Sequence, residues 1–163
     1  MRNYLWKLIM SFITYPQANG QVAVIIPADP SLSIEEIAVK DVPAGLPYKI
    51  VDSLEIDNDF FNAYDFNADN GFVENISRAQ EIQLSKWRKL RTPLLSTLDV
   101  HFNMAIEHAD VTGQAAIAMQ KQALRDVTKT NLPSDTIANI KAVVPGILTQ
   151  TYTYTPPVVP EAS

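Results

Sequence analysis

The sequence lacks cysteine and has few residues of the kinds that most catalytic sites require. Its 163 residues include no cysteine, two histidines and five glycines. Without cysteine there is no disulfide, no thiolate metal ligand and no cysteine nucleophile. Neither a Gly-x-Ser-x-Gly elbow nor a glycine-rich phosphate loop occurs in the chain, and these are the usual signatures of hydrolases and phosphate-binding enzymes. We therefore expect a protein that is not an enzyme.

Candidates for a metal site are few. His101 and His108 are seven residues apart, whereas two zinc ligands on one helix usually stand four apart and a site needs three or four ligands. Residues 65–71 have the alternating oxygen side chains of a calcium loop, but the glycine comes one place late. The twelfth position is Ile76 instead of a carboxylate. We predict no catalytic residue, no metal and no cofactor.

Charge is sparse and unevenly distributed along the chain. Charged residues make up 19% of the total, and the net charge is −5. Residues 1–76 contain four basic against eleven acidic residues, a balance of −7, and residues 77–163 contain nine against seven, a balance of +2. The acidic half would repel nucleic acid and anionic lipid, so we expect neither a nucleic acid nor a membrane as partner. The asymmetry indicates two units that could attract each other or a partner of opposite sign.

The first residues superficially resemble a signal sequence. The apolar run is broken by Lys7, is too short to span a bilayer and leads to no convincing cleavage site. We interpret residues 1–9 as an upstream extension, and the sequence leaves open whether Met1 or Met10 is the natural start.

Residues 10–60 are predicted to form a small α+β unit. Asn19-Gly20 provides the positive φ angles of a tight hairpin between two strands rich in β-branched residues. Ser33 and Glu36 form a capping box that starts a short helix. The expected elements are strands at 12–15, 21–27 and 48–51 and a helix at 33–40. Residues 61–76, which are acidic and aromatic, are predicted to be a linker.

Residues 77–148 are predicted to form a helical domain. In its first helix, capped by Ser77, apolar residues recur at steps of three and four, which indicates one buried stripe. These residues are Trp87, Leu90, Leu94, Leu98, Phe102, Ala105 and Ala109. Pro93 predicts a kink or a restart near Arg91, because proline removes a backbone donor.

Two further helices are expected after a break at Thr112-Gly113, one over 114–130 and a short one over 135–144. The proline-rich tail, residues 149–163, has no evident apolar periodicity and is predicted to be extended or disordered. The fold class is thus α+β: a small hairpin-and-helix unit followed by an antiparallel helical hairpin with a third short helix.

One basic cluster stands out beside Trp87, formed by Lys86, Arg88, Lys89 and Arg91. It could bind a phosphate backbone or an acidic protein surface, with the indole as an anchor. The alternative is a solvated helix face whose charges meet the acidic N-terminal unit. Four cations with a single aromatic residue are weak evidence for nucleic-acid binding.

Two segments carry a resemblance to a known family. Residues 87–99, a basic helix with paired leucines and an aspartate, and residues 122–128, which contain Leu124-Arg125-Asp126, resemble tail assembly chaperones and related small tail-region proteins of tailed bacteriophages. Residues 10–16 and 40–48 are also similar to phage proteins of this kind. The sequence departs from the family at residues 118–121, where a tryptophan-tyrosine pair is often found.

The resemblance implies a non-enzymatic protein that assists tail or tail-fibre assembly by binding another polypeptide in the host cytoplasm. The alternative is a structural component of the virion, and a homo-oligomer is left open. The expected partner-binding residues are an anchor, Trp87, orienting arginines and a leucine seam. The full set is Trp87, Arg88, Arg91, Leu94, Leu95, Arg125 and Asp126.

Overall fold

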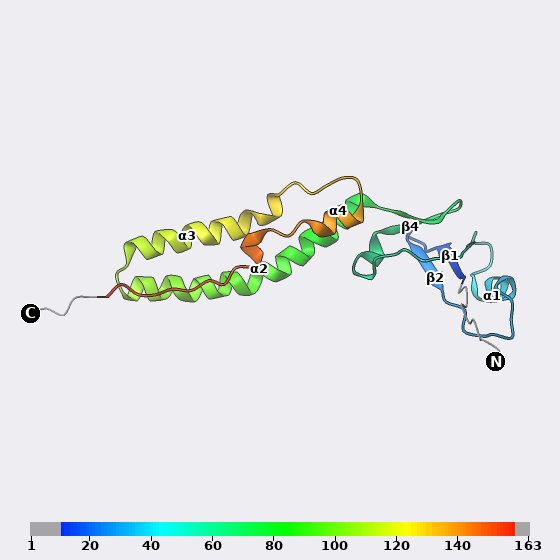
Figure 1. Cartoon of the computed structure of the whole chain (residues 1–163), viewed down its shortest axis with the longest axis horizontal. Helices are drawn as coiled ribbons and strands as arrows, with labels where there is room; N and C mark the ends of the chain where they lie inside the picture. The colour runs from blue at the N-terminus through cyan, green and yellow to red at the C-terminus, as the bar shows by residue number, and fades with distance from the viewer. Residues whose placement is uncertain (1–10, 159–163) are drawn as a thin grey trace, which may run out of the picture. The chain divides into compact units, whose positions relative to one another are not determined.

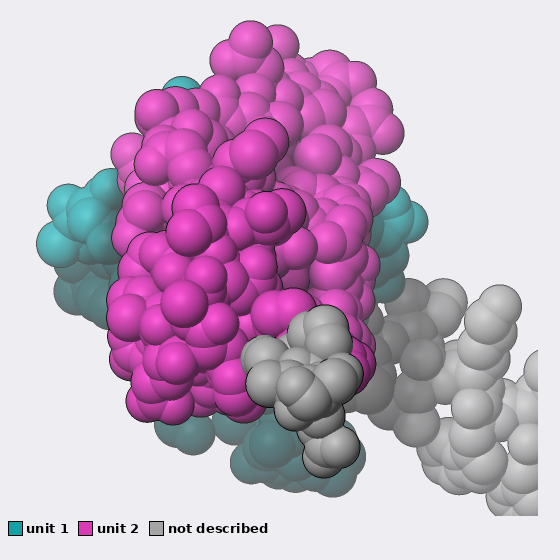
Figure 2. All heavy atoms as spheres, turned by 90° about the vertical axis from the view of Figure 1, so that its left-hand side faces the viewer, with its two compact units in different colours: residues 1–79 teal, residues 80–163 magenta. Residues whose placement is uncertain are grey.

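The chain forms two compact units, residues 1–79 and residues 80–163, which are coloured separately in Figure 2. The computed structural model describes residues 11–158, so the interpretation of residues 1–9 lies outside the described part. The first unit is built from short antiparallel strands and one short helix, and the second from helices (Figure 1). The predicted α+β class, with a C-terminal helical hairpin, is confirmed.

The first sheet contains the predicted hairpin. Strand β1 (Phe12–Pro16) pairs antiparallel with β2 (Val22–Ile25) and with β3 (Lys49–Val51), giving the order β2-β1-β3. Ile13 lies opposite both Ile25 and Ile50 and is fully buried. Gly20, with φ of 82°, makes the turn between β1 and β2 that the Asn-Gly dipeptide predicts.

Helix α1 (Ile34–Asp41) begins at the predicted capping box. The backbone N–H of Glu36 donates to Ser33 Oγ at 3.2 Å, and the N–H of Ser33 donates to Glu36 Oε2 at 2.7 Å. The bonds from Ser33 lower the pKa of the Glu36 carboxyl. The helix buries Ile37 and Ala38 in a cluster with Ile13 and Val42.

The predicted linker over residues 61–76 is wrong, because these residues fold into a second hairpin. A 3-10 helix, η1 (Asn58–Ala63), leads into β4 (Tyr64–Asn67), which pairs antiparallel with β5 (Gly71–Glu74). The ring of Tyr64 meets that of Phe72 edge to face at 5.8 Å. The aromatic residues of this segment therefore pack within the folded unit and do not mark a flexible linker.

The segment that resembles a calcium loop is the turn of this second hairpin. Asn67 Oδ1 accepts from the backbone N–H groups of Asp69 and Asn70 at 3.0 and 2.9 Å, an ordinary Asx turn. Gly71 follows with φ of 86°, and a Cβ there would lie 2.6 Å from Val51 Cγ1 and 2.9 Å from Thr14 Oγ1. Only glycine lets the second hairpin approach the first sheet so closely.

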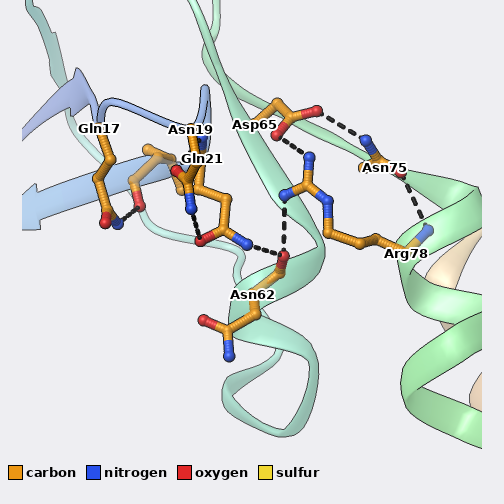
Figure 3. Close-up of polar contacts among 8 residues, drawn as sticks. Gln17, Asn19, Gln21, Asn62, Asp65, Asn75 and Arg78 are labelled. Carbon is orange, nitrogen blue, oxygen red and sulfur yellow. Dashed lines mark hydrogen bonds and ion pairs between the residues drawn. The ribbon is translucent and has the colours of Figure 1, made fainter.

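A polar network joins the second hairpin to the start of the long helix α2 (Ile76–Glu107) (Figure 3). Arg78 Nη2 pairs with Asp65 Oδ1 at 2.5 Å, and Arg78 Nη1 donates to the carbonyl of Asn62 at 3.0 Å. Asn75 donates to the other oxygen of Asp65 and accepts from the N–H of Arg78. Asn75 therefore caps α2, and the prediction that Ser77 is the cap was wrong by two residues.

The second unit is a helical hairpin with a short third helix. Helix α2 and helix α3 (Val111–Asp126) run antiparallel side by side (Figure 1). A 3-10 turn, η2 (Val127–Lys129), precedes α4 (Ile137–Ala142), and another, η3 (Gly146–Leu148), follows it. The core comprises Trp87, Leu98, Ala105, Ile117, Leu124, Val127, Leu148 and Tyr152.

One predicted helix restart does not occur, and one predicted helix break lies elsewhere. Helix α2 continues through Pro93 without a restart. The turn to α3 falls at residues 108–110, where Ala109 has φ of 50°, and not at Thr112-Gly113. Asp110 caps α3 by accepting from the N–H of Gly113 at 2.9 Å, so the glycine taken as a breaker belongs to the first turn of the helix.

The tail packs against the hairpin over the part that the structure describes. Residues 150–158 are extended, as predicted, but Tyr152 is 8% exposed and belongs to the core. Tyr154 is half-buried, and its hydroxyl donates to Asp110 Oδ2 at 3.1 Å. In Figure 1 this segment runs along α2 toward the α2–α3 turn. The prediction that it lacks apolar periodicity was wrong, because tyrosines alternate with exposed threonines.

Candidate partner-binding surface

The expected anchor, Trp87, is a core residue. Its side chain is 2% exposed and lies in the cluster that contains Leu98 and Leu124. The helix places Trp87, Leu98 and Ala105 on its inner face, because their spacings of 11 and 7 residues are close to three and two full turns. In this fold the indole is buried, so it holds the hairpin together and is not presented to a partner.

The expected leucine seam is also internal. Leu94 and Leu95 are half-buried and pack against the same cluster. Leu90, which the apolar stripe assigned to the core, is 51% exposed. The stripe therefore mixes residues of two faces, because a spacing of three and four alone does not say which face is covered.

Arg91 connects residues 87–99 with residues 122–128, the two segments singled out in the sequence analysis. Its Nη1 donates to the backbone carbonyl of Arg125 at 3.0 Å and to Thr128 Oγ1 at 3.5 Å. The carbonyls of the last helical turn have no partner within the helix, and a guanidinium is well suited to satisfy them. The main-chain acceptor at the end of α3 is therefore satisfied by a side chain of α2.

Asp126 is held within its own segment. Its carboxylate pairs with Lys129 at 2.6 Å and accepts from Gln122 Nε2 at 2.9 Å. The bonds from Lys129 and then Gln122 lower the pKa of this carboxyl. A second ion pair, Lys121 with Asp99 at 2.6 Å, joins α3 to α2, and the same ammonium lies 5.0 Å from the ring centre of Phe102.

Of the predicted residues, Arg88 and Arg125 are left as exposed side chains. Arg88 stands one turn before Arg91 on α2, and Arg91 is bonded to the main chain of Arg125. We call these three residues the arginine edge. It presents guanidinium groups from two helices, and guanidinium forks recognise carboxylates in bidentate geometry.

A second cluster, which the sequence prediction missed as a unit, lies at the α2–α3 turn. Tyr154 donates to one oxygen of Asp110, whose other oxygen caps α3. The His101 ring lies 6.3 Å from that of Tyr154, and its buried Nδ1 has no hydrogen-bond partner in the described part of the chain. Burial, and then Asp110, raise the pKa of the Tyr154 hydroxyl. The alternating Thr-Tyr pattern of the tail was the signal that could have indicated this contact.

The residues that the structure describes include no group of three or more histidine, aspartate or glutamate side chains placed to hold a metal ion. One open hollow of about 430 Å³ lies in the first unit, and none of the predicted site residues lines it. Its lining includes Glu55, Glu74 and the rings of Tyr64 and Phe72.

Comparisons with protein-family models, curated proteins and solved structures find no match for this chain. Among residues 11–158, no helix has both the length and the apolar character needed to cross a bilayer.

Proposed function

We propose that this chain is a non-enzymatic phage protein that assists tail or tail-fibre assembly by binding another polypeptide. The arginine edge is the contact surface, and the partner presents carboxylates to it. The protein acts in the host cytoplasm during assembly.

The contact between Arg91 and the carbonyl of Arg125 carries this proposal. The two segments that resemble tail assembly chaperones are separated by the end of α2, a turn and most of α3, yet this bond brings their basic residues together. The exposed side chains of Arg88 and Arg125 then lie near a guanidinium whose position is held by a main-chain bond. The held guanidinium of Arg91 loses little side-chain freedom on binding, and guanidinium groups pair well with the carboxylates of an acidic surface.

A structural component of the virion is the second candidate, and the exposed apolar stripe of α2 described below favours it. Mass spectrometry of purified particles separates the two candidates. A chaperone is absent from mature particles or present in traces, whereas a structural subunit is stoichiometric.

Co-expression with phage tail and tail-fibre proteins tests the partner contact. One of them should co-purify with the tagged protein, and Arg88→Glu/Arg125→Glu should abolish that association. The matched control Lys40→Glu/Lys141→Glu reverses two exposed charges elsewhere and should leave it unchanged. Binding that is insensitive to the arginine reversals, or the absence of any association with these proteins, would contradict the proposal.

A further inference from the structure

The outer face of α2 carries an apolar stripe that no described residue covers. Leu90, Pro93, Thr97 and Val100 follow one another at steps of three, four and three residues, so they share one side of the helix. Leu90 is 51% and Val100 58% exposed, and Pro93 and Thr97 are exposed as well. The core residues of α2 lie on a different face, and none of the stripe residues belongs to the buried cluster of the hairpin.

The hydroxyl groups around the stripe are already bonded to the helix itself. Thr92 Oγ1 donates to the carbonyl of Arg88 at 2.9 Å, and Ser96 Oγ donates to the carbonyl of Thr92 at 3.2 Å. Thr97 Oγ1 donates to the carbonyl of Pro93 at 3.1 Å. Because these donors are satisfied, covering this face costs less desolvation than the sequence composition implies.

Two opposite charges flank the stripe at matched positions. Lys89 and Glu107 are both exposed, and neither forms an ion pair with another residue among 11–158. They are 18 residues apart, which is about five helical turns, so they lie on the same line along α2 at a separation of roughly 27 Å. Their midpoint falls at the level of residue 98, between Thr97 and Val100 of the stripe.

This arrangement is self-complementary about a two-fold axis. If a second α2 lies antiparallel across the stripe, Lys89 of each copy faces Glu107 of the other, and Thr97 and Val100 meet their own counterparts near the axis. A parallel arrangement instead places Lys89 of one copy level with Lys89 of the other on opposite flanks of the stripe, so neither ion pair can form. Closed two-fold dimers require this kind of surface, in which one patch binds its own copy.

We propose that a second copy of this chain docks antiparallel on the α2 stripe formed by Leu90, Pro93, Thr97 and Val100. The inference goes beyond the proposed function, because Arg88 lies on roughly the opposite side of α2. A single helix pair buries a limited area, so the dimer is weak and forms at micromolar or higher concentration.

Sedimentation equilibrium of the full chain, from about 1 to about 500 µM, tests this proposal. The wild type should show a reversible monomer–dimer equilibrium. Val100→Lys places two like charges beside the axis and should leave a monomer throughout the range. Ile106→Lys makes the same change at a residue of α2 that is 52% exposed and lies away from the stripe, and it should dimerise like the wild type.

A charge exchange tests the orientation without touching the apolar residues. Lys89→Glu and Glu107→Lys should each weaken dimerisation by about tenfold, and the double variant should restore it. Circular dichroism of each variant verifies that the helices are intact. A wild type that stays monomeric at every concentration overturns the proposal, as does a double variant as weak as its single parents. Arg88→Glu/Arg125→Glu should dimerise normally, which separates this result from the partner test.

Discussion

Arg91 and Arg125 are joined through a side chain on one helix and the main chain of another, with 3.0 Å between Arg91 Nη1 and the carbonyl oxygen of Arg125. The two arginines, which the sequence suggests are equivalent, therefore have different roles. The guanidinium of Arg91 stabilises the end of α3, whereas the side chain of Arg125 is exposed.

We expect this difference to appear in the free energy of unfolding. Arg91→Ala removes a charged donor from the carbonyl and should cost about 1–2 kcal/mol. Arg125→Ala retains the carbonyl and should change stability by less than about 0.5 kcal/mol. Urea unfolding followed by circular dichroism measures both values. Equal losses in the two variants would show that the Arg125 side chain, and not its carbonyl, makes the interaction.

Trp87 and Leu90 provide a second contrast within one turn of α2. Trp87→Ala leaves a large cavity in the helical core and should destabilise the chain by about 3–5 kcal/mol. Leu90→Ala truncates a side chain that is 51% exposed and should cost less than about 1 kcal/mol in the monomer. The measurement is urea unfolding below the concentration at which the dimer forms. A large loss at Leu90 under those conditions would place it in the core of the hairpin.

Alanine substitutions at Gly71 and Gly45 distinguish the cost of backbone strain from the cost of steric conflict. Both have positive φ, 86° and 83°, so alanine at either position meets a similar conformational penalty of about 1 kcal/mol. A Cβ at Gly45 has no neighbour within 4 Å, whereas one at Gly71 meets Val51 and Thr14. Gly71→Ala should therefore cost about 1–3 kcal/mol more than Gly45→Ala in thermal or urea unfolding. Equal costs would mean that the second hairpin moves aside freely.

Tyr154 should make the stability of the chain fall at alkaline pH. Burial and Asp110 raise the pKa of its hydroxyl above the ordinary value of 10.0, so above pH 10 the folded state retains a proton that the unfolded state releases. Stability is thus lost as the pH rises from the unfolded to the folded pKa. Tyrosinate absorbance should show a late-titrating phenol that Tyr154→Phe removes.

The matched variant for this titration is Asp110→Asn, which keeps a side-chain oxygen to cap α3 and removes the negative charge. It should move the titration of Tyr154 to lower pH without abolishing the effect of burial. An unchanged late phase in Tyr154→Phe would assign that phase to Tyr152, whose pKa burial also raises.

Local chemistry made part of the fold predictable. The Asn19-Gly20 turn and the Ser33/Glu36 capping box depend on residues close in sequence, so their geometry follows from the residue types. The second hairpin was missed because its strands have only four residues each, and the acidic residues between its aromatic ones suggest solvent exposure. The helix break predicted at Gly113 was wrong for a related reason. A glycine that ends a helix cannot be distinguished in sequence from one that makes room for a capping aspartate.

The site was harder to predict than the fold because burial depends on contacts between distant residues. Trp87 beside four cations has the composition of a binding anchor, yet the core that covers it comes from α3 and from the tail. Arg91 was predicted to orient a partner, and the acceptor that it has in the structure is a main-chain atom of Arg125, which no side-chain pattern can indicate. Arg88 and Arg125 remain predictions as partner contacts.

Asp110 divides its two oxygens between a helix start and an extended strand of chain far along the sequence. Truncation of the chain before Tyr154 should therefore weaken the hydrogen bond between Asp110 and the N–H of Gly113, in addition to removing the tail. Faster hydrogen exchange at that amide would report the lost phenol, so a shortened version of this protein should have a weakened start of α3 as well as a missing tail.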